Sequence, residues 1–130
     1  GQCYAYRVDC GDKSVVYATD AEYKKIGSGD LKPYVEFFKD ADLLIFDSMY
    51  TFSEGLEKED WGHSSTFIGV DLAVKANVKQ IAFFHHEPTY SDFKLADILK
   101  QTEKYLKLVA PKKGLKMLLS YEGLTIDLHQ

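Results

Sequence analysis

The sequence has few cysteines, the residues that stabilise small secreted domains by forming disulfides and small zinc domains by binding the metal. Cys3 and Cys10 are the only cysteines among 130 residues, too few for a disulfide framework or a closed zinc site. No stretch approaches the roughly 20 apolar residues that span a bilayer. No basic, apolar and small-residue pattern of a signal peptide opens the chain. We therefore expect a cytoplasmic protein with no membrane partner.

Basic side chains are also scarce. Arg7 is the only arginine, the lysines are scattered, and the net charge is -4. Such a chain lacks the broad basic face that holds long nucleic acid, so no long nucleic acid is expected as a partner. Hydrophobic residues make up 45% of the chain and charged residues 28%, which argues against disorder and fits a single domain with a usable core.

Hydrophobic periodicity predicts alternating helices and strands in the middle of the chain. Residues 3–18 have the alternation and turn chemistry of a β-hairpin. The apolar runs at 43–46 and 81–84 predict strands buried on both faces. The remaining predicted elements are helices at 34–39 after Pro33, from Ser64 or Ser65 to about Asn77, and from Ser91 to about Leu108, then strands at 117–120 and 124–126. This order predicts a layered α/β fold, with helices packed on a mixed sheet.

Several polar side chains follow predicted strands or precede a predicted helix, where ligands collect in layered α/β folds. They are Asp20, Asp47, His63, Ser64, His85 and His86. Carboxylates and imidazoles suit a metal ion or an acid/base reaction. Taken singly, each has an ordinary interpretation: a turn or helix cap for Asp20, a turn carboxylate for Asp47, and helix-start chemistry for His63. One of the paired histidines is expected to lie behind the ligands or to be structural.

Four short motifs, in order, resemble the C-terminal half of the metallo-β-lactamase superfamily. They are Tyr17-Ala18-Thr19-Asp20, Ala41-Asp42-Leu43-Leu44-Ile45-Phe46-Asp47, Trp61-Gly62-His63-Ser64-Ser65 and Phe84-His85-His86-Glu87-Pro88. The most similar branch is that of the phosphodiesterases, which includes tRNA-processing ribonuclease Z and the phosphoribosyl cyclic phosphodiesterases. The resemblance covers nearly the whole chain. It implies half of an αββα sandwich, in which two mixed sheets lie between helices.

The resemblance also implies roles for the matching residues. Asp20 would bridge two divalent metal ions, zinc or manganese, and His85 would bind one of them. His63 would donate a proton near the leaving group, and Asp47, where the branch has a glutamate, would pair with this histidine. The implied reaction is hydrolysis of a small phosphodiester or cyclic phosphodiester. The two remaining candidates, expected behind the ligands or facing the substrate, are His86 and Ser64.

The chain departs from the family because the His-x-His-x-Asp-His cluster is absent. A further ligand histidine expected before the acidic motif is absent too. The resemblance therefore implies that most metal ligands lie before Gly1, and that residues 1–130 are the C-terminal half of a larger hydrolase. Alone, the chain should be inactive and bind metal weakly or not at all. Half of a sandwich leaves one sheet face uncovered, so we expect the missing N-terminal half or a second copy to cover it, the latter making a homo-oligomer.

Two other functions stay open. A binding or scaffold domain of the same fold, without catalysis, would also lack the metal cluster. A receiver-type module would use Asp47 as its phosphoacceptor at the end of a buried strand. The sequence disfavours the receiver, which needs an acidic pair after its first strand and a lysine after a late strand. Here a hairpin and the His85-His86 pair occupy those places.

Overall fold

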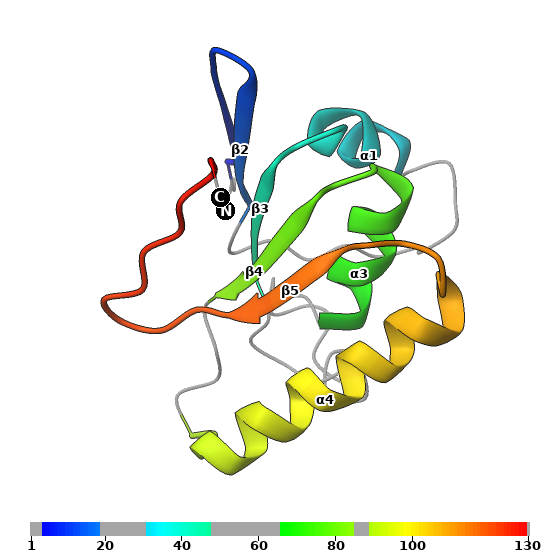
Figure 1. Cartoon of the computed structure of the whole chain (residues 1–130), viewed down its shortest axis with the longest axis vertical. Coiled ribbons are helices and arrows are strands. Elements are labelled where there is room, and N and C mark those ends of the chain that lie inside the picture. Colours follow the sequence, from blue (N-terminus) through cyan, green and yellow to red (C-terminus); the bar gives the residue numbers. More distant parts are fainter. Residues whose placement is uncertain (1–3, 19–30, 48–65, 85–88, 130) are drawn as a thin grey trace.

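The fold is a five-stranded mixed sheet with helices packed on it (Figure 1). A computed structural model describes residues 4–18, 31–47, 66–84 and 89–129. In chain order, the elements are β1 (Tyr6–Cys10), β2 (Lys13–Ala18), α1 (Lys32–Phe38), β3 (Leu43–Asp47), α3 (Thr66–Lys75), β4 (Gln80–Phe84), α4 (Asp92–Val109) and β5 (Lys116–Leu119). The predicted α/β class with a mixed sheet is confirmed. In the described part of the chain, no helix is long and apolar enough to span a bilayer.

The strand order explains why the described helices all lie on one face of the sheet. The strands lie in sequence order from β1 to β5; β1 is antiparallel to β2, and each later pair is parallel. Each parallel pair is joined by a crossover, and such crossovers are right-handed. Because the order never reverses, successive crossovers place α1, α3 and α4 on the same face, as Figure 1 shows.

The core lies between this face and the helices. Val16, Leu44 and Ile81 form one row across the sheet, and all three are fully buried. Phe46 and Phe83 form the next row and are also fully buried. Three neighbouring strands therefore present apolar side chains to the helices at matched heights, which favours this register over a one-residue slip.

We call the opposite face, which none of the described helices covers, the open face. Its large exposed apolar side chains are Tyr6, Val8, Tyr17 and Phe84, with exposed fractions of 60%, 62%, 40% and 41%. The rings of Tyr17 and Phe84 lie 6.3 Å apart. Leu43 and Ala82 lie on the same face and are buried. The exposed aromatic side chains form an apolar surface of the kind that marks an interaction site.

Most predicted elements are confirmed, and their ends have local causes. Ser91 caps α4, accepting a hydrogen bond from the backbone N–H of Lys94 at 3.2 Å. Helix α3 ends before Asn77, whose φ of 58° is left-handed and stops the helix. The predicted strand at 124–126 is wrong: the segment is not in a ladder of the described sheet, because strand pattern alone does not supply a partner edge.

Candidate functional site

The candidate site lies at the edge of the sheet where β2, β3 and β4 end. In register, Ala18 pairs with Phe46, which pairs with Phe83, and Asp47 pairs with Phe84. Because these strands are parallel, their last residues lie side by side. Ala18 ends its strand two residues before Asp20, and Phe84 directly precedes His85. In the sequence, the described ends of β2, β3 and β4 therefore lie at or just before three predicted site residues, which are Asp20, Asp47 and His85.

Asp47 is the one predicted site residue that the structure describes. It is the last residue of β3, and none of its surface is exposed. A carboxylate buried at this depth is stable only when it is hydrogen-bonded or paired. Such a group can orient a neighbouring imidazole. Full burial also disfavours the receiver alternative, because a phosphoacceptor must be reached by its phosphodonor.

The other predicted residues, Asp20, His63, Ser64, His85 and His86, lie outside the described residues. Their roles remain predictions. Within residues 4–18, 31–47, 66–84 and 89–129, no group of three or more histidine, cysteine, aspartate or glutamate side chains could hold a metal ion. The described residues therefore do not make a metal site by themselves. Asp47 alone supplies one carboxylate, short of the three or four ligands that zinc uses in proteins.

Helix α3 begins close to the predicted site, because its first residue, Thr66, follows directly after His63, Ser64 and Ser65. The helix lies tightly on the sheet at Gly69. A Cβ atom added there would lie 2.8 Å from a ring atom of Phe46 and 2.9 Å from one of Phe83. Glycine at this place lets the first half of α3 approach the last residues of β3 and β4.

Helix α4 contacts α3 through one buried and one half-buried pair of polar groups. The Thr66 and Thr102 hydroxyl oxygens lie 2.8 Å apart, and both residues are buried. One turn further along, the Tyr105 hydroxyl donates a hydrogen bond of 2.7 Å to Asp71. The Tyr105 ring stacks on that of Phe67, with centroids 4.5 Å apart. Burial, followed by the bond to Asp71, raises the pKa of Tyr105 to about 12.

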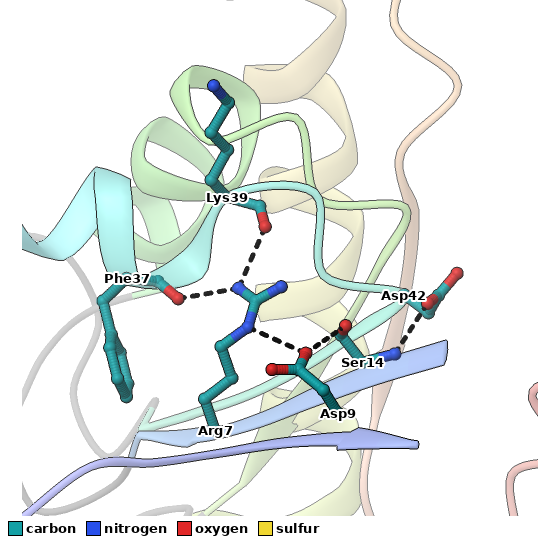
Figure 2. A network of polar contacts seen from close by, with 6 residues as sticks. All are labelled: Arg7, Asp9, Ser14, Phe37, Lys39 and Asp42. Atoms are coloured by element: carbon teal, nitrogen blue, oxygen red, sulfur yellow. Dashed lines mark hydrogen bonds and ion pairs between the residues drawn. The ribbon is translucent and has the colours of Figure 1, made fainter. Parts of the chain in front are cut away.

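A second polar network lies away from the candidate site and connects the β1–β2 hairpin to α1 (Figure 2). The Arg7 guanidinium donates hydrogen bonds of 2.8 Å to the carbonyl of Phe37 and 2.9 Å to that of Lys39. These carbonyls belong to the end of α1, where the helix leaves acceptors unsatisfied. Arg7 also donates to Asp9, which accepts a further bond from the Ser14 hydroxyl. The Ser14 bond and then the Arg7 bond hold the pKa of Asp9 below its usual value.

Asp42 extends this network to the start of β3. Its carboxylate accepts a 2.8 Å hydrogen bond from the backbone N–H of Ser14 and a 3.1 Å bond from Lys79 (Figure 2 shows the first). The Lys13 ammonium lies 3.9 Å away. Burial alone would raise the pKa of Asp42, but the Ser14 and Lys79 bonds outweigh it and lower the pKa. Sequence reasoning missed this network, because its members are far apart in the chain.

Comparison with curated proteins identifies relatives that share one name. The chain is 42% identical over 65 residues to "Ribonuclease Z" of Sulfurisphaera tokodaii, covering 50% of this chain and 22% of that protein. It is 34% identical over 101 residues to "Ribonuclease Z" of Sulfolobus acidocaldarius, covering 72% and 33%. "Ribonuclease Z" of Prochlorococcus marinus is 32% identical over 95 residues, covering 70% and 28%. The chain thus spans about a quarter to a third of these relatives. No family model matches the chain.

Solved structures share the fold at lower sequence identity. The metallo-beta-lactamase fold protein YhfI from Bacillus subtilis matches with a TM-score of 0.71 and 21% identity, over 96% of this chain and 44% of that one. The short form of human tRNase Z matches with a TM-score of 0.64 and 15% identity, over 95% and 36%. Residues 1–130 therefore match part of the ribonuclease Z relatives in sequence and part of a metallo-β-lactamase fold in structure.

Proposed function

We propose that residues 1–130 form the C-terminal part of a metal-dependent phosphodiesterase, whose remaining part supplies most of the metal ligands. One observation carries the proposal: buried Asp47 ends β3 beside the described ends of β2 and β4, which lead to Asp20 and His85. Helix α3, which follows His63, packs through Gly69 on the same strands. Carboxylates and imidazoles are the groups that metal-assisted hydrolysis uses at the ends of parallel strands.

In this proposal Asp47 orients His63, and His63 gives a proton to the leaving oxygen of the substrate. A carboxylate beside an imidazole raises its basicity and selects its orientation. Asp20 and His85 belong to the metal-binding set, with zinc or manganese as the metal and other ligands from outside residues 1–130. The two residues proposed to lie behind the ligands or to face the substrate are His86 and Ser64.

The proposed substrate is a phosphodiester. The relatives named ribonuclease Z favour a phosphodiester in RNA. The single arginine and the net charge of -4 favour a small or cyclic phosphodiester, as far as residues 1–130 contribute to binding. Both substrates use the same reaction class, so the chemistry can be tested before the substrate is known.

The test uses the full product of the gene, purified and assayed with cyclic AMP and with a dinucleoside phosphate, which are phosphodiesters whose alkoxide leaving groups need a proton. His63→Ala should lower turnover by about 100-fold or more while bound metal, measured by elemental analysis, stays constant. His129→Ala is the control, because His129 is exposed near the C-terminus, and it should change neither quantity. Equal loss of metal and turnover in His63→Ala would instead make His63 a ligand or a structural residue.

A gene product without bound metal and without a His-x-His-x-Asp-His cluster upstream would overturn the proposal. The scaffold alternative would then be favoured. Reading the upstream coding sequence is therefore the first step, because it separates the two functions before any protein is made.

A further inference from the structure

Lysines that are scattered along the sequence meet at one edge of the fold. This is the edge where β3, β4 and β5 begin, and the length of β4, five residues or about 15 Å, separates it from the strand ends at the candidate site. Three connections lie here: 39–42 before β3, 75–80 from the end of α3 into β4, and 110–116 from α4 into β5. They contain six lysines and two acidic residues, whereas the whole chain has a net charge of -4. Figure 1 shows the second and third connections at the ends of β4 and β5 opposite to their arrowheads.

Backbone hydrogen bonds hold these connections side by side. The N–H of Asp40 donates to the carbonyl of Ala76 at 2.8 Å. The N–H of Lys79 donates to the carbonyl of Ala41 at 3.0 Å. The N–H of Lys116 in turn donates to the carbonyl of Lys79 at 3.1 Å. Lysines from three separate parts of the chain therefore share one surface.

Two turns at this edge are fixed by their own contacts. The N–H of Lys113 donates to the carbonyl of Ala110 at 3.1 Å, and Pro111 occupies the second position of that turn, where its fixed φ fits. The Lys113 ammonium donates to the side-chain oxygen of Asn77 at 3.2 Å. Asn77 has a left-handed φ of 58°, and its side-chain amide donates to Asp40 at 2.8 Å. A ligand therefore finds this surface already ordered, which lowers the entropy cost of binding.

Four exposed lysines at this edge have no acidic partner in the described part of the chain. We call them the lysine edge: Lys75, Lys112, Lys113 and Lys116. Lys79 differs, because its ammonium lies 3.1 Å from the carboxylate of Asp42. Like charges gathered on one surface repel one another, and their potential attracts an anion. The lysine edge is therefore a positively charged patch on a chain with a net negative charge.

The helix dipole explains only one of these lysines. A cation in the last turn of a helix interacts favourably with the negative end of the dipole, and this effect fades beyond that turn. Lys75 is the last residue of α3 and fits this role. Helix α4 ends at Val109, so the other three lysines lie beyond its last turn. The ammonium groups of Lys112 and Lys116 have no hydrogen bond or ion pair to any described residue.

We propose that the lysine edge binds the phosphate backbone of a nucleic acid, and recognises charge rather than base sequence. A nucleic acid presents negative charges at short, regular intervals, so several lysines can contact one molecule, whereas a single phosphate group would contact one or two. The inference goes beyond the proposed function, because it uses none of the candidate site residues. The bound backbone lies at the opposite edge of the sheet from the candidate site.

The side chains at this edge favour a nucleic acid over a protein or a membrane. Protein interfaces are centred on apolar and aromatic side chains, and helices that insert into a membrane surface expose such side chains too. The connections 75–80 and 110–116 are fully described, and neither contains a large exposed hydrophobic residue. The nearest in the sequence, Leu108 and Val109, belong to the last turn of α4. Contacts to a phosphate backbone require only cations and hydrogen-bond donors.

The experiment measures binding of the full gene product to short fluorescent duplexes, RNA and DNA of equivalent sequence, by anisotropy. A chelator stops metal-dependent hydrolysis during the measurement. Lys112→Gln with Lys113→Gln should weaken binding by about 10-fold or more, and should make the slope of log affinity against log salt shallower by about 2. Lys100→Gln with Lys104→Gln is the matched control, because it removes the same charge from exposed residues of α4, and it should change neither quantity.

Equal weakening by the two double variants would mean that net charge alone attracts the duplexes, and would overturn the proposal, as would no binding of either duplex. Binding to vesicles that contain phosphatidylserine, without binding to the duplexes, would also overturn it. Equal affinity for RNA and DNA would support contacts to the phosphates alone. Tighter binding of one duplex would also support the proposal and identify that nucleic acid as the ligand, since the 2′-hydroxyl groups distinguish RNA from DNA.

Turnover of cyclic AMP separates this inference from the proposed function. A full product that hydrolyses cyclic AMP, but binds the duplexes equally well in both double variants, would overturn the lysine edge alone. A full product that needs Lys112 and Lys113 to bind the duplexes, but neither binds metal nor hydrolyses a phosphodiester, would support the lysine edge and overturn the hydrolase.

Discussion

The hydroxyl oxygens of Thr66 and Thr102 lie 2.8 Å apart between α3 and α4, and both are buried. Thr102 donates its own hydrogen to the carbonyl of Ile98 at 2.6 Å, so Thr66 must be the donor of the pair. This bond joins the first residue of α3 to the middle of α4. It holds the helix start that directly follows His63, Ser64 and Ser65.

Thr102→Val should lower the free energy of unfolding by about 1–2 kcal/mol, because it leaves the buried Thr66 hydroxyl without its acceptor. Urea titration measures the loss. Thr66→Val is the matched variant, and the double variant should lose less than the sum of the two single losses, since no orphaned hydroxyl then remains. Additive losses would show that the two hydroxyls are not coupled.

Gly69→Ala should destabilise the chain although alanine favours helices. The new methyl would meet the fully buried rings of Phe46 and Phe83 at 2.8 and 2.9 Å. Overpacking of this kind costs about 1–3 kcal/mol, and better helix propensity offsets about 1 kcal/mol of that, so a net loss of up to about 2 kcal/mol is expected. Gly114→Ala is the control, because no heavy atom lies within 4 Å of its added Cβ. Equal midpoints for the two variants in urea would contradict the tight contact.

Arg7→Gln should loosen the end of α1, because the Phe37 and Lys39 carbonyls lose their charged donor. We expect a loss of about 1 kcal/mol and faster amide exchange in α1. Asp9→Asn separates the carbonyl contacts from the ion pair, since Asp9 is 61% exposed and such pairs contribute little. If Asp9→Asn lowered the free energy of unfolding as much as Arg7→Gln did, loss of the ion pair rather than of the carbonyl contacts would explain the effect.

Asp42 should make stability depend on acidic pH. Its pKa is lowered in the folded state, so its contribution is present above the unfolded value, near 3.8, and is lost as pH falls through the folded value. Asp42→Asn should therefore cost about 1–2 kcal/mol at pH 7 and flatten the stability curve below pH 4. Glu122→Gln, at an exposed residue, is the control. An unchanged slope below pH 4 in Asp42→Asn would refute this role.

Strong local patterns predicted much of the fold. The hairpin, the strands around Leu44 and Ile81, and the long helix capped by Ser91 all have signals within a few residues. The strand predicted at 124–126 failed because a strand needs a partner edge, which no local signal supplies. The Arg7 and Asp42 networks were missed for a related reason: Arg7 bonds residues 30 and 32 positions away.

The sequence by itself determined most of the described helices and strands, because burial periodicity and caps act within one element. It also carried the ordered motifs by which the superfamily is recognised. Only the tertiary structure decided that β2, β3 and β4 end side by side, that Asp47 is buried there, and that the described helices all pack on one face of the sheet. Those properties depend on strand order and crossover handedness, which arise when distant segments pack together.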